Sequence, residues 1–449
     1  MTTPARAFTH DEAGTSEARW SAAPGWSGVA QAPRLADLGV RRLVVVAAHP
    51  DDETLAAGGL IALAAAAGLE VCLVLLTDGE GSHPASPTTG ADELGRLRVE
   101  ESRQALRLLA PHARLERLGM PDGSVADHVD DVVTTLVDLV REDGPETLLV
   151  APWRADGHAD HDAAGRAAAV AAWRTDARLW EYPVWLWHWC EPDDAPWDDL
   201  NVLRLPDEVL AAKAGAVACH RTQVAPLSDA AGDERVLHDG MLAHFDRAQE
   251  TFLSLGPLAD DSLDRLHDDV DDPWRVRTSW YEERKRAVTL ASLPHERYSR
   301  ALEVGGSIGR LAADLAGRCG ELVVVDESEA AVRASEAALA GDAGVTVLRR
   351  TVPEQWPDGA FDLVVVSEVG YFLSPQRLRR LARRVDAALS ADGVVVLCHW
   401  QHPIEGWPLD GARVAEIWQH ESALPVVASH LETDFALHVL SRTDAHRAT

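Results

Sequence analysis

Hydrophobic residues in the first half of the chain fall in short continuous runs that alternate with longer amphipathic segments. Short apolar runs are typical of buried strands, and apolar residues with a helical period indicate helices packed on one side. The runs predict strands at 42–48, 71–77, 115–118 and 147–151, and the longer segments predict helices at 54–68, 94–109 and 129–142. Strands that alternate with helices predict a mostly parallel sheet covered by helices on both faces.

The same alternation begins again in the second half, after an acidic and weakly apolar segment. It predicts helices at 280–293, 308–316 and 327–339, and strands at 301–304, 322–325, 345–348, 361–366 and 393–399. We therefore expect an α/β protein with two doubly wound, mostly parallel-sheet, Rossmann-like domains.

The pattern also predicts where these domains begin and end. We expect a largely irregular lead-in at 1–41, a first domain at 42–257, an acidic linker at 258–274 and a second domain at 275–443. Within the lead-in, we expect Trp20 and Trp26 to dock on the protein surface. A chain of 449 residues is long enough for two domains that each bury a core.

The charge and composition narrow the choice of partners. The net charge of −30 disfavours binding to nucleic acid or to anionic membranes, because both are negatively charged. No apolar run reaches 18 residues, and the first residues do not resemble a secretory signal. The five cysteines are dispersed with no C-x-x-C pair, which is typical of a reducing compartment. We expect a cytoplasmic protein that acts on a small molecule.

Two His/Asp clusters follow two of the predicted strands. His49-Pro50-Asp51-Asp52-Glu53 comes directly after strand 42–48, and Asp156-Gly157-His158-Ala159-Asp160-His161 comes after strand 147–151. Ligands of such sheets collect at the carboxyl ends of the strands, so the two clusters can converge on one site. A catalytic zinc usually has three protein ligands and one open position. The sequence therefore predicts a divalent-metal site, the alternative being solvated loop charges.

The two clusters together resemble the PIG-L/LmbE family of zinc-dependent N-deacetylases. The resemblance extends over about 42–255 and implies His49, Asp52 and His161 as ligands of Zn²⁺ or another divalent metal. It implies Asp51 as the general base, His158 as the group that stabilises the oxyanion, and Asp160 as the residue that orients the active-site histidine. Arg98 and Glu101 match a helix common in the family, where we expect them to form an ion pair.

A glycine-rich loop follows the predicted strand 301–304. Its sequence is Glu303-Val304-Gly305-Gly306-Ser307-Ile308-Gly309, and Asp326 ends the next strand. Glycines let a ligand approach the backbone closely, and an acidic residue at that place can hold ribose hydroxyls. The pattern therefore indicates a nucleotide-type cofactor, with a dinucleotide enzyme or a domain without cofactor as alternatives.

The E-x-G-x-x-x-G form of this loop resembles class I S-adenosylmethionine-dependent methyltransferases. The segments Asp272-Pro273-Trp274, Tyr281-Glu282-Glu283-Arg284-Lys285 and His399-Trp400-Gln401-His402-Pro403 resemble nodulation-protein-S-like members, a resemblance that covers about 271–440. The resemblance implies that Gly305, Ser307 and Gly309 line the methionine and ribose, that Asp326 binds the ribose hydroxyls, and that Glu303 reaches the cofactor amine indirectly. Ser307 stands where the usual loop has glycine. The Asn-Pro-Pro-Tyr motif of many amine and base methyltransferases is absent, so the candidates for catalysis are Glu368, Tyr371 and His399.

The combined motifs favour a bifunctional enzyme. One half would hydrolyse an N-acyl amide, with an N-acetyl aminosugar as the expected substrate, and the other would transfer methyl, with the freed amine as a possible acceptor. The alternative is a methyltransferase whose first half serves only as a substrate-binding module.

Overall fold

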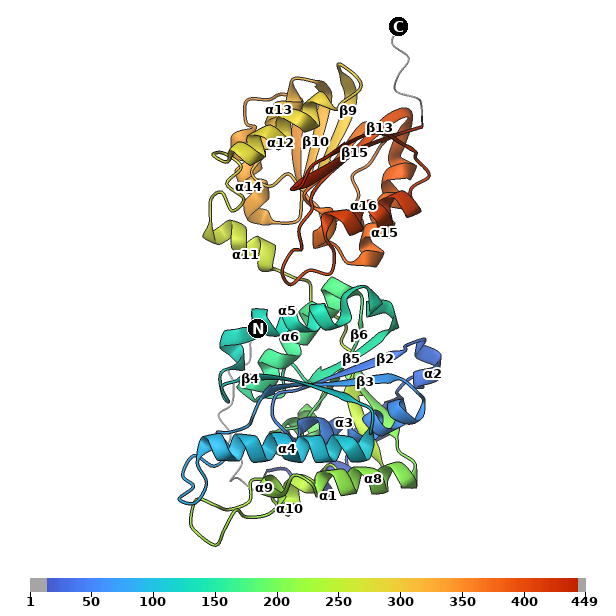
Figure 1. Ribbon diagram of the computed structural model, residues 1–449. Helices are drawn as coiled ribbons and strands as arrows, with labels where there is room; N and C mark the ends of the chain where they lie inside the picture. Colours follow the sequence, from blue (N-terminus) through green and yellow to red (C-terminus); the bar gives the residue numbers. More distant parts are fainter. Residues whose placement is uncertain (1–13, 443–449) are drawn as a thin grey trace. The chain divides into compact units, whose positions relative to one another are not determined.

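The computed structural model describes residues 14–442 (Figure 1). The chain divides into two compact units on either side of the Leu258–Ala259 peptide bond. Residues 1–13 of the predicted lead-in and residue 443, the predicted end of the second domain, lie outside the described residues.

The first unit is built on an eight-stranded mixed sheet with the order β1-β7-β8-β6-β5-β2-β3-β4. Strands β2 to β6 pair in parallel, and β8 is antiparallel to β6 and β7. Four of these strands were predicted, with ends that differ by a few residues. The strands are β1 (Ala30–Gln31), β2 (Arg42–Ala47), β3 (Glu70–Thr77), β4 (Arg114–Met120), β5 (Thr147–Pro152), β6 (Arg178–Tyr182), β7 (Leu200–Arg204) and β8 (Gln249–Leu253).

Helices cover both faces of this sheet. The longer ones are α3 (Asp52–Ala66), α4 (Ala91–Leu109), α5 (Val129–Val140), α6 (Ala159–Thr175) and α8 (Asp207–Val217); the short ones are α1 (Glu17–Ser21), α2 (Leu35–Leu38), α7 (Leu186–Trp189), α9 (Arg221–Val224) and α10 (Asp239–Leu242).

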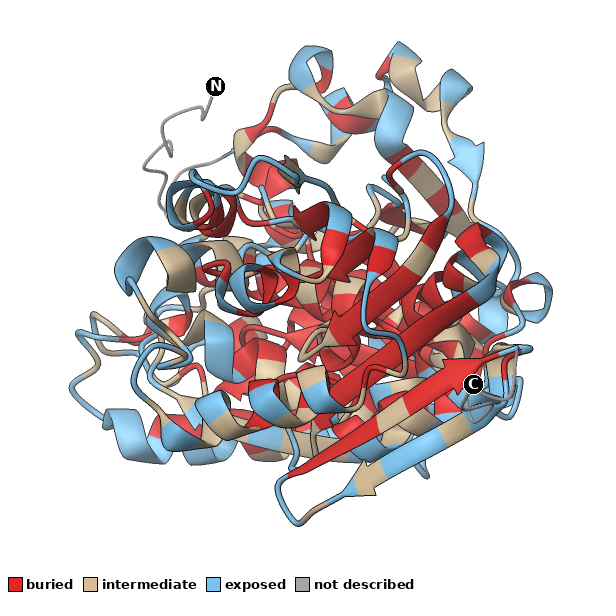
Figure 2. Cartoon of the chain, turned by 90° about the horizontal axis from the view of Figure 1, so that it is seen from above, coloured by how far each residue is buried: buried red, intermediate tan, exposed pale blue. Residues whose placement is uncertain are grey.

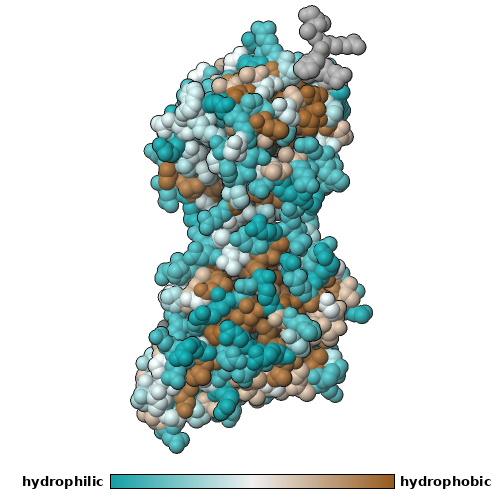
Figure 3. Space-filling model, viewed as in Figure 1, coloured by the Kyte–Doolittle hydropathy of each residue, from teal (hydrophilic) through white to brown (hydrophobic). Residues whose placement is uncertain are grey.

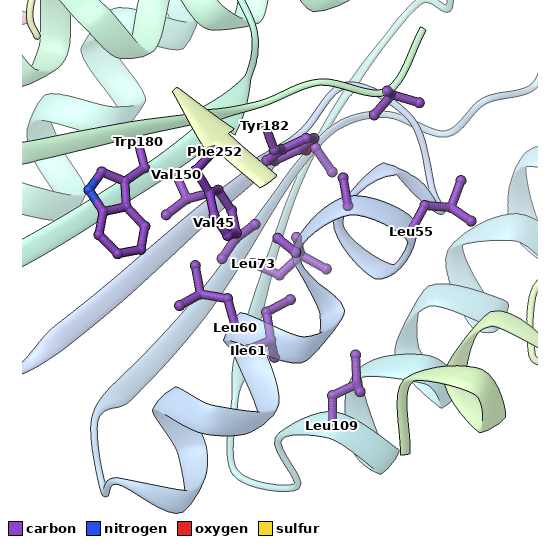
Figure 4. Packing of buried hydrophobic residues seen from close by; sticks show 14 of the residues in the cluster. Val45, Leu55, Leu60, Ile61, Leu73, Leu109, Val150, Trp180, Tyr182 and Phe252 are labelled. Atoms are coloured by element: carbon purple, nitrogen blue, oxygen red, sulfur yellow. The ribbon is translucent and has the colours of Figure 1, made fainter. Parts of the chain in front are cut away.

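Alternate residues of each central strand face different cores. Val45 packs with Leu60 and Ile61 of α3 in one cluster (Figure 4), whereas Val44 and Val46 pack with α5 and α6 in the other. Burial on both faces explains why the strand at 42–47 is an unbroken apolar run. Buried residues concentrate along the strands, and the outer helix faces are exposed (Figure 2).

The described part of the predicted lead-in forms regular structure and belongs to the first unit. Strand β1 extends the sheet by pairing with β7. Trp20 is fully buried, and its indole Nε1 donates a hydrogen bond to Trp187 O at 2.7 Å. The expected surface position of Trp20 is therefore wrong, because Trp20 packs edge-on against Trp187 and fills the first core. Trp26 is partly buried beside it.

The second unit has a seven-stranded sheet with the order β11-β10-β9-β12-β13-β15-β14. All neighbours from β11 to β13 are parallel, and β15 and β14 add an antiparallel edge. The strands are β9 (Tyr298–Val304), β10 (Cys319–Asp326), β11 (Val345–Arg349), β12 (Phe361–Ser367), β13 (Leu389–Trp400), β14 (Val426–Leu431) and β15 (Phe435–Ser441). The predicted fold class, two mostly parallel α/β sheets, is confirmed for both units.

Helices again pack on both faces of this sheet. Leu302 and Val304 pack with α15 and α16, whereas Ala301 packs with α13. Helix α11 lies inside the segment predicted as an acidic linker and contacts α14. The helices are α11 (Ser262–Asp269), α12 (Trp280–Ala291), α13 (Arg310–Ala316), α14 (Glu329–Ala338), α15 (Pro375–Ala388) and α16 (Gly411–Glu421).

The surface shown in Figure 3 is mainly hydrophilic on each unit, with hydrophobic residues in scattered patches. Among residues 14–442, no helix combines the length and the apolarity needed to cross a membrane.

Candidate metal centre and cofactor pocket

The first site lies where the strand order of the first sheet reverses. Strands β2 and β5 are parallel neighbours, with Val45 opposite Val150. The chain then leaves β2 toward α3 and β5 toward α6, on opposite faces of the sheet. Such a reversal opens a crevice at the carboxyl ends of the strands. Both predicted His/Asp clusters therefore meet at one edge.

The three predicted ligands lie together at this edge. Asp52 is central: its Oδ2 is 3.6 Å from His49 Nδ1, and its Oδ1 is 3.3 Å from His161 Nε2. All three side chains are buried. His158 joins them, since one ring nitrogen from each of the three histidines lies within 4.8 Å of the others.

His161 is held by Asp156, a residue of the second cluster to which the sequence assigned no role. Asp156 Oδ2 accepts a hydrogen bond from His161 Nδ1 at 2.8 Å. The same carboxylate accepts backbone N–H bonds from Val184, Trp185 and Leu186, so its position is fixed from the loop after β6. With Nδ1 donating, Nε2 of the neutral ring is the nitrogen with a free lone pair.

His49 is surrounded by carboxylates on both sides of its ring. Its Nε2 lies 3.1 Å from Asp122 Oδ1 and 3.2 Å from Asp160 Oδ2, opposite the Asp52 contact. Burial alone would lower the pKa of His49, but hydrogen bonds to Asp122, Asp160 and Asp52 raise it well above its usual value. Asp122, which lines the pocket beside the centre, is a second residue that sequence reasoning did not assign.

Asp160 has two different contacts in the centre. Its carboxylate touches His49 and accepts backbone N–H bonds from Gly123 and Val125. Its own backbone N–H donates to His158 Nδ1 at 3.2 Å. The neutral His158 ring therefore carries its proton on Nε2.

Asp51, the predicted base, is held in an unusual backbone conformation. Its φ of 143° lies outside the regions favoured by non-glycine residues, a strain that is typical of functional sites. Arg98 Nη2 is 3.2 Å from Asp51 Oδ2 and also donates to Pro50 O. Burial raises the pKa of Asp51 to about 7, against the opposing charge of Arg98.

The expected Arg98–Glu101 ion pair is wrong. Arg98 pairs with Asp51 instead, and Glu101 accepts hydrogen bonds from the backbone and the hydroxyl of Thr222. The two residues lie on one helix, but their partners come from the loop after β2 and from α9, far away in the sequence.

The donor set fits a divalent metal. His161 Nε2 is buried and has no hydrogen-bond partner among the described residues 14–442, although it faces Asp52 Oδ1. Imidazole nitrogens with a carboxylate oxygen are ligands of zinc and of other first-row metals. An open pocket of about 250 Å³ is lined by His49, Asp51 and Asp52 on one side, and also by Arg98, Asp122 and Trp185.

The aromatic-rich segment 182–189, which begins at the last residue of β6, contributes both to the core and to the site. Tyr182 and Trp187 are buried in the first core. Trp185 lines the pocket, and its ring is nearly parallel to that of His158, with the ring centroids 6.4 Å apart.

A second pocket lies at the corresponding reversal in the other sheet, between β9 and β12. It has a volume of about 90 Å³ and is lined by Gly305, Ser307, Asp326 and Glu368 among others. Gly305 has a φ of 79°, and a Cβ atom there would lie 2.0 Å from Val369 Cγ2. Glycine is therefore favoured at this position by both the positive φ and the close Val369 side chain.

The other predicted cofactor residues surround this loop. Asp326 accepts backbone N–H bonds from Ser307 at 2.9 Å and Ser328 at 3.0 Å. Gly309 has a φ of 76°, and Ser307 adopts a φ of 45° in spite of its side chain. Glu303, near the end of β9, is buried, and its Oε2 has no hydrogen-bond partner in the part of the chain that the structure describes.

The fold and the two sites define a two-unit α/β protein with a His/Asp metal-type centre in one unit and a nucleotide-type pocket in the other. The family "PIG-L: GlcNAc-PI de-N-acetylase" matches residues 44–172, and the family "Nodulation protein S (NodS)" matches residues 259–406. The chain belongs to the PIG-L family through its first unit and carries a NodS-like methyltransferase domain in its second.

Curated relatives match the first unit. The 1D-myo-inositol 2-acetamido-2-deoxy-alpha-D-glucopyranoside deacetylase of Rhodococcus erythropolis is 30% identical over 286 residues, which span 50% of this chain and 96% of the relative. The enzyme of the same name from Actinosynnema mirum is 31% identical, over 42% of this chain and 83% of the relative. For the Streptomyces griseus enzyme the identity is 35%, over 30% of this chain and half of the relative.

Solved structures match the second unit. A putative methyltransferase from Pseudomonas syringae is 43% identical, covering 36% of this chain and 100% of that one, with a TM-score of 0.34. The N-methyltransferase NodS from Bradyrhizobium japonicum, in complex with S-adenosyl-L-homocysteine, is 23% identical, covering 40% of this chain and 96% of that one, with a TM-score of 0.38.

Proposed function

We propose that the chain is a bifunctional enzyme. Its first unit hydrolyses the N-acyl amide of an aminosugar, and its second unit transfers a methyl group from S-adenosylmethionine, with the freed amine as acceptor. The observation that carries the first activity is the convergence of His49 and His161 on Asp52, next to a pocket that His49, Asp51 and Asp52 line. The names of the curated relatives support an N-acetylglucosamine-type substrate.

We assign the metal to His49, Asp52 and His161, with Zn²⁺ as the first choice. When bound, a divalent metal lowers the pKa of its water and polarises the amide carbonyl. Asp156 supports this role, because it leaves the Nε2 lone pair of His161 free for a ligand bond.

Asp51 then serves as the general base. It lines the pocket next to Asp52, and Arg98 fixes the direction of its carboxylate. Asp51 takes the proton of the attacking water and delivers it to the leaving amine, which completes the hydrolysis.

His158 stabilises the negative charge that develops on the amide oxygen. Because its Nδ1 accepts a backbone N–H, the neutral ring offers Nε2–H as a donor. Burial and the neighbouring His161 and His49 lower the pKa of His158 to about 3, which keeps it neutral. Asp160 orients two of the histidines: its carboxylate contacts His49, and its backbone N–H donates to His158.

In the second unit, we assign the cofactor to the pocket lined by Gly305, Ser307 and Asp326. Each Asp326 carboxylate oxygen accepts one backbone N–H and would use its second lone pair for a ribose hydroxyl. Gly309 provides the positive φ of the loop turn. Glu303 would act through the loop on the cofactor amine. Bound S-adenosylmethionine supplies an electrophilic methyl group, and the chain's task is to orient the acceptor nitrogen.

Both activities can be tested on the purified chain. N-acetylglucosamine and its inositol glycoside are incubated with the Zn²⁺-loaded protein, and acetate release is measured. Methyl transfer is measured separately with labelled S-adenosylmethionine and glucosamine. Acetate release by the wild type but not by a chelator-treated sample supports the hydrolase; methyl transfer without any acetate release would favour the alternative, a methyltransferase with a substrate-binding first half.

A further inference from the structure

Glu368 lies at the reversal of the second sheet, next to the cofactor loop. It follows β12, whose Val366 pairs in parallel with Val304 of β9, directly before Gly305. Glu368 lines the same pocket as Gly305 and Asp326, and its side chain is 29% exposed there. A carboxylate is thus presented to the place where a ligand of this fold binds.

The backbone of Glu368 is fixed in a conformation that such a residue rarely adopts. Its φ is 60°, in the left-handed region. Its N–H donates to Cys398 O at 2.9 Å, and its Oε1 accepts the backbone N–H of Trp400 at 2.8 Å. Both contacts come from β13, so the sheet itself holds this carboxylate at the pocket.

The charges around Glu368 leave an excess of one negative charge. Lys285 Nζ lies 3.1 Å from Glu368 Oε2 and 2.8 Å from Glu282 Oε1, so one ammonium is shared by two carboxylates. Tyr371 OH donates to the same Oε2 at 3.0 Å. Within residues 14–442, Oε1 accepts only the Trp400 N–H, which leaves it one lone pair for a ligand.

The two other candidates for catalysis are already engaged. His399 is buried, and its Nε2 accepts the backbone N–H of Gly370 at 3.1 Å. The hydroxyl of Tyr371 is bonded to Glu368, and its side chain is buried. Of the three candidates, only Glu368 lines the pocket.

We infer that Glu368 is the residue of the methyltransferase unit that binds the acceptor nitrogen of the amine substrate proposed above. The inference rests on the proposed function. An uncompensated negative charge favours an amine, which carries positive charge as it reacts, over a neutral amide. The site would thus accept the product of the hydrolase and reject its substrate.

The transfer step follows from this contact. The amine lone pair forms the new N–C bond to the methyl group while the C–S bond of the sulfonium breaks and its electron pair stays on sulfur. The acceptor becomes a methylammonium, and S-adenosylhomocysteine leaves as a neutral thioether. Glu368 accepts a hydrogen bond from the amine and then takes the released proton, which passes to solvent. Trp274 and Phe372, which also line the pocket, offer apolar ring faces to the sugar.

The test compares the full chain with its Glu368→Gln variant, which removes the charge and keeps the shape. Glu283→Gln on α12 is the matched control, since Glu283 does not line the pocket. Calorimetry first measures the affinity of each protein for S-adenosylhomocysteine. It then measures the affinity of the S-adenosylhomocysteine-loaded protein for glucosamine and for glucose, which has a hydroxyl in place of the amine. The first unit is identical in all proteins, so its contribution cancels in the comparison.

We expect the wild type and the control to bind glucosamine at least about tenfold more tightly than glucose, and Glu368→Gln to lose this preference with cofactor affinity unchanged. We also expect methyl transfer to glucosamine to fall by about 10²-fold or more. A Glu368→Gln protein that keeps both the preference and the rate overturns the inference.

Two further results separate this inference from the proposed function. If the wild type binds S-adenosylhomocysteine and prefers glucosamine but transfers no methyl, the proposed activity fails and the binding role stands. If Glu368→Gln also fails to bind S-adenosylhomocysteine, the Glu368→Asp variant, which keeps the charge, is tested instead. A Glu368→Asp protein that binds S-adenosylhomocysteine but does not prefer glucosamine to glucose overturns the inference.

Discussion

Asp156 Oδ2 and His161 Nδ1 are joined by a 2.8 Å hydrogen bond between two fully buried side chains. This bond determines which nitrogen of His161 faces Asp52, and three backbone N–H groups hold Asp156 in place. The candidate metal centre is therefore built from the loop after β6 as well as from the two motifs.

Replacing Asp156 by Asn tests this support. We expect the metal affinity to fall by about 10- to 100-fold, because His161 loses the partner that fixes its tautomer. Competition with a chromogenic chelator measures the affinity. Unchanged affinity in a folded Asp156→Asn protein would contradict the assignment of His161 as a ligand.

Replacing Asp51 by Asn tests the proposed base. The variant should keep its metal, since the three assigned ligands remain, but lose amide hydrolysis by about 10²–10⁴-fold. Acetate release and metal content are measured on the same sample.

The exposed Asp127, outside the pocket, provides the matched control. Asp127→Asn should retain full hydrolysis. Wild-type rates in Asp51→Asn would show that another group takes the proton.

The sequence predicted the structure correctly wherever the positions of the residues follow from a local pattern. The strands before His49 and His161 are buried on both faces, so they read as continuous apolar runs, and parallel pairing brings their ends together. The partner of Arg98 could not be predicted in this way, because Asp51 is distant along the chain and the contact depends on how α4 packs. The burial of Trp20 could not be predicted for the same reason, because its partner, Trp187, is 167 residues away.

Asp326 offers a test that the two activities are independent. Asp326→Ala removes the carboxylate that we assign to the ribose and that accepts the Ser307 and Ser328 N–H groups. We expect at least about a tenfold loss of S-adenosylhomocysteine affinity, since a charge-assisted hydrogen bond contributes about 1.5–3 kcal/mol. Calorimetry measures this, and acetate release should stay at the wild-type rate. Loss of both activities would mean that the variant disturbs the first unit as well.

The lowered pKa of Glu17 predicts that the unfolding free energy of the first unit depends on pH. Burial alone would raise its pKa, but hydrogen bonds from His244 and Arg247 lower it to about 2 from the usual 4.5. A carboxyl whose pKa is lower in the folded state stabilises the fold above the unfolded-state pKa, and this contribution disappears as the pH falls from about 4.5 to about 2.

Glu17→Gln should therefore lower the unfolding free energy of the first unit by about 1 kcal/mol at pH 7, a value reduced for partial exposure. The difference from the wild type should shrink as the pH falls below 4.5. Urea unfolding at pH 7 and at pH 3 measures it, and an equal difference at both pH values would contradict the account of Glu17.

The central claim is that one chain removes an acyl group and then methylates the exposed amine. The most direct test incubates the Zn²⁺-loaded wild type with an N-acetylglucosamine inositol glycoside and methyl-labelled S-adenosylmethionine, and follows the sugar by mass spectrometry. We predict the N-methyl amine from the wild type, and no methylated product from Asp51→Asn unless the free amine is supplied. Methylation of the still-acetylated sugar, or equal labelling by Asp51→Asn, would contradict the claim.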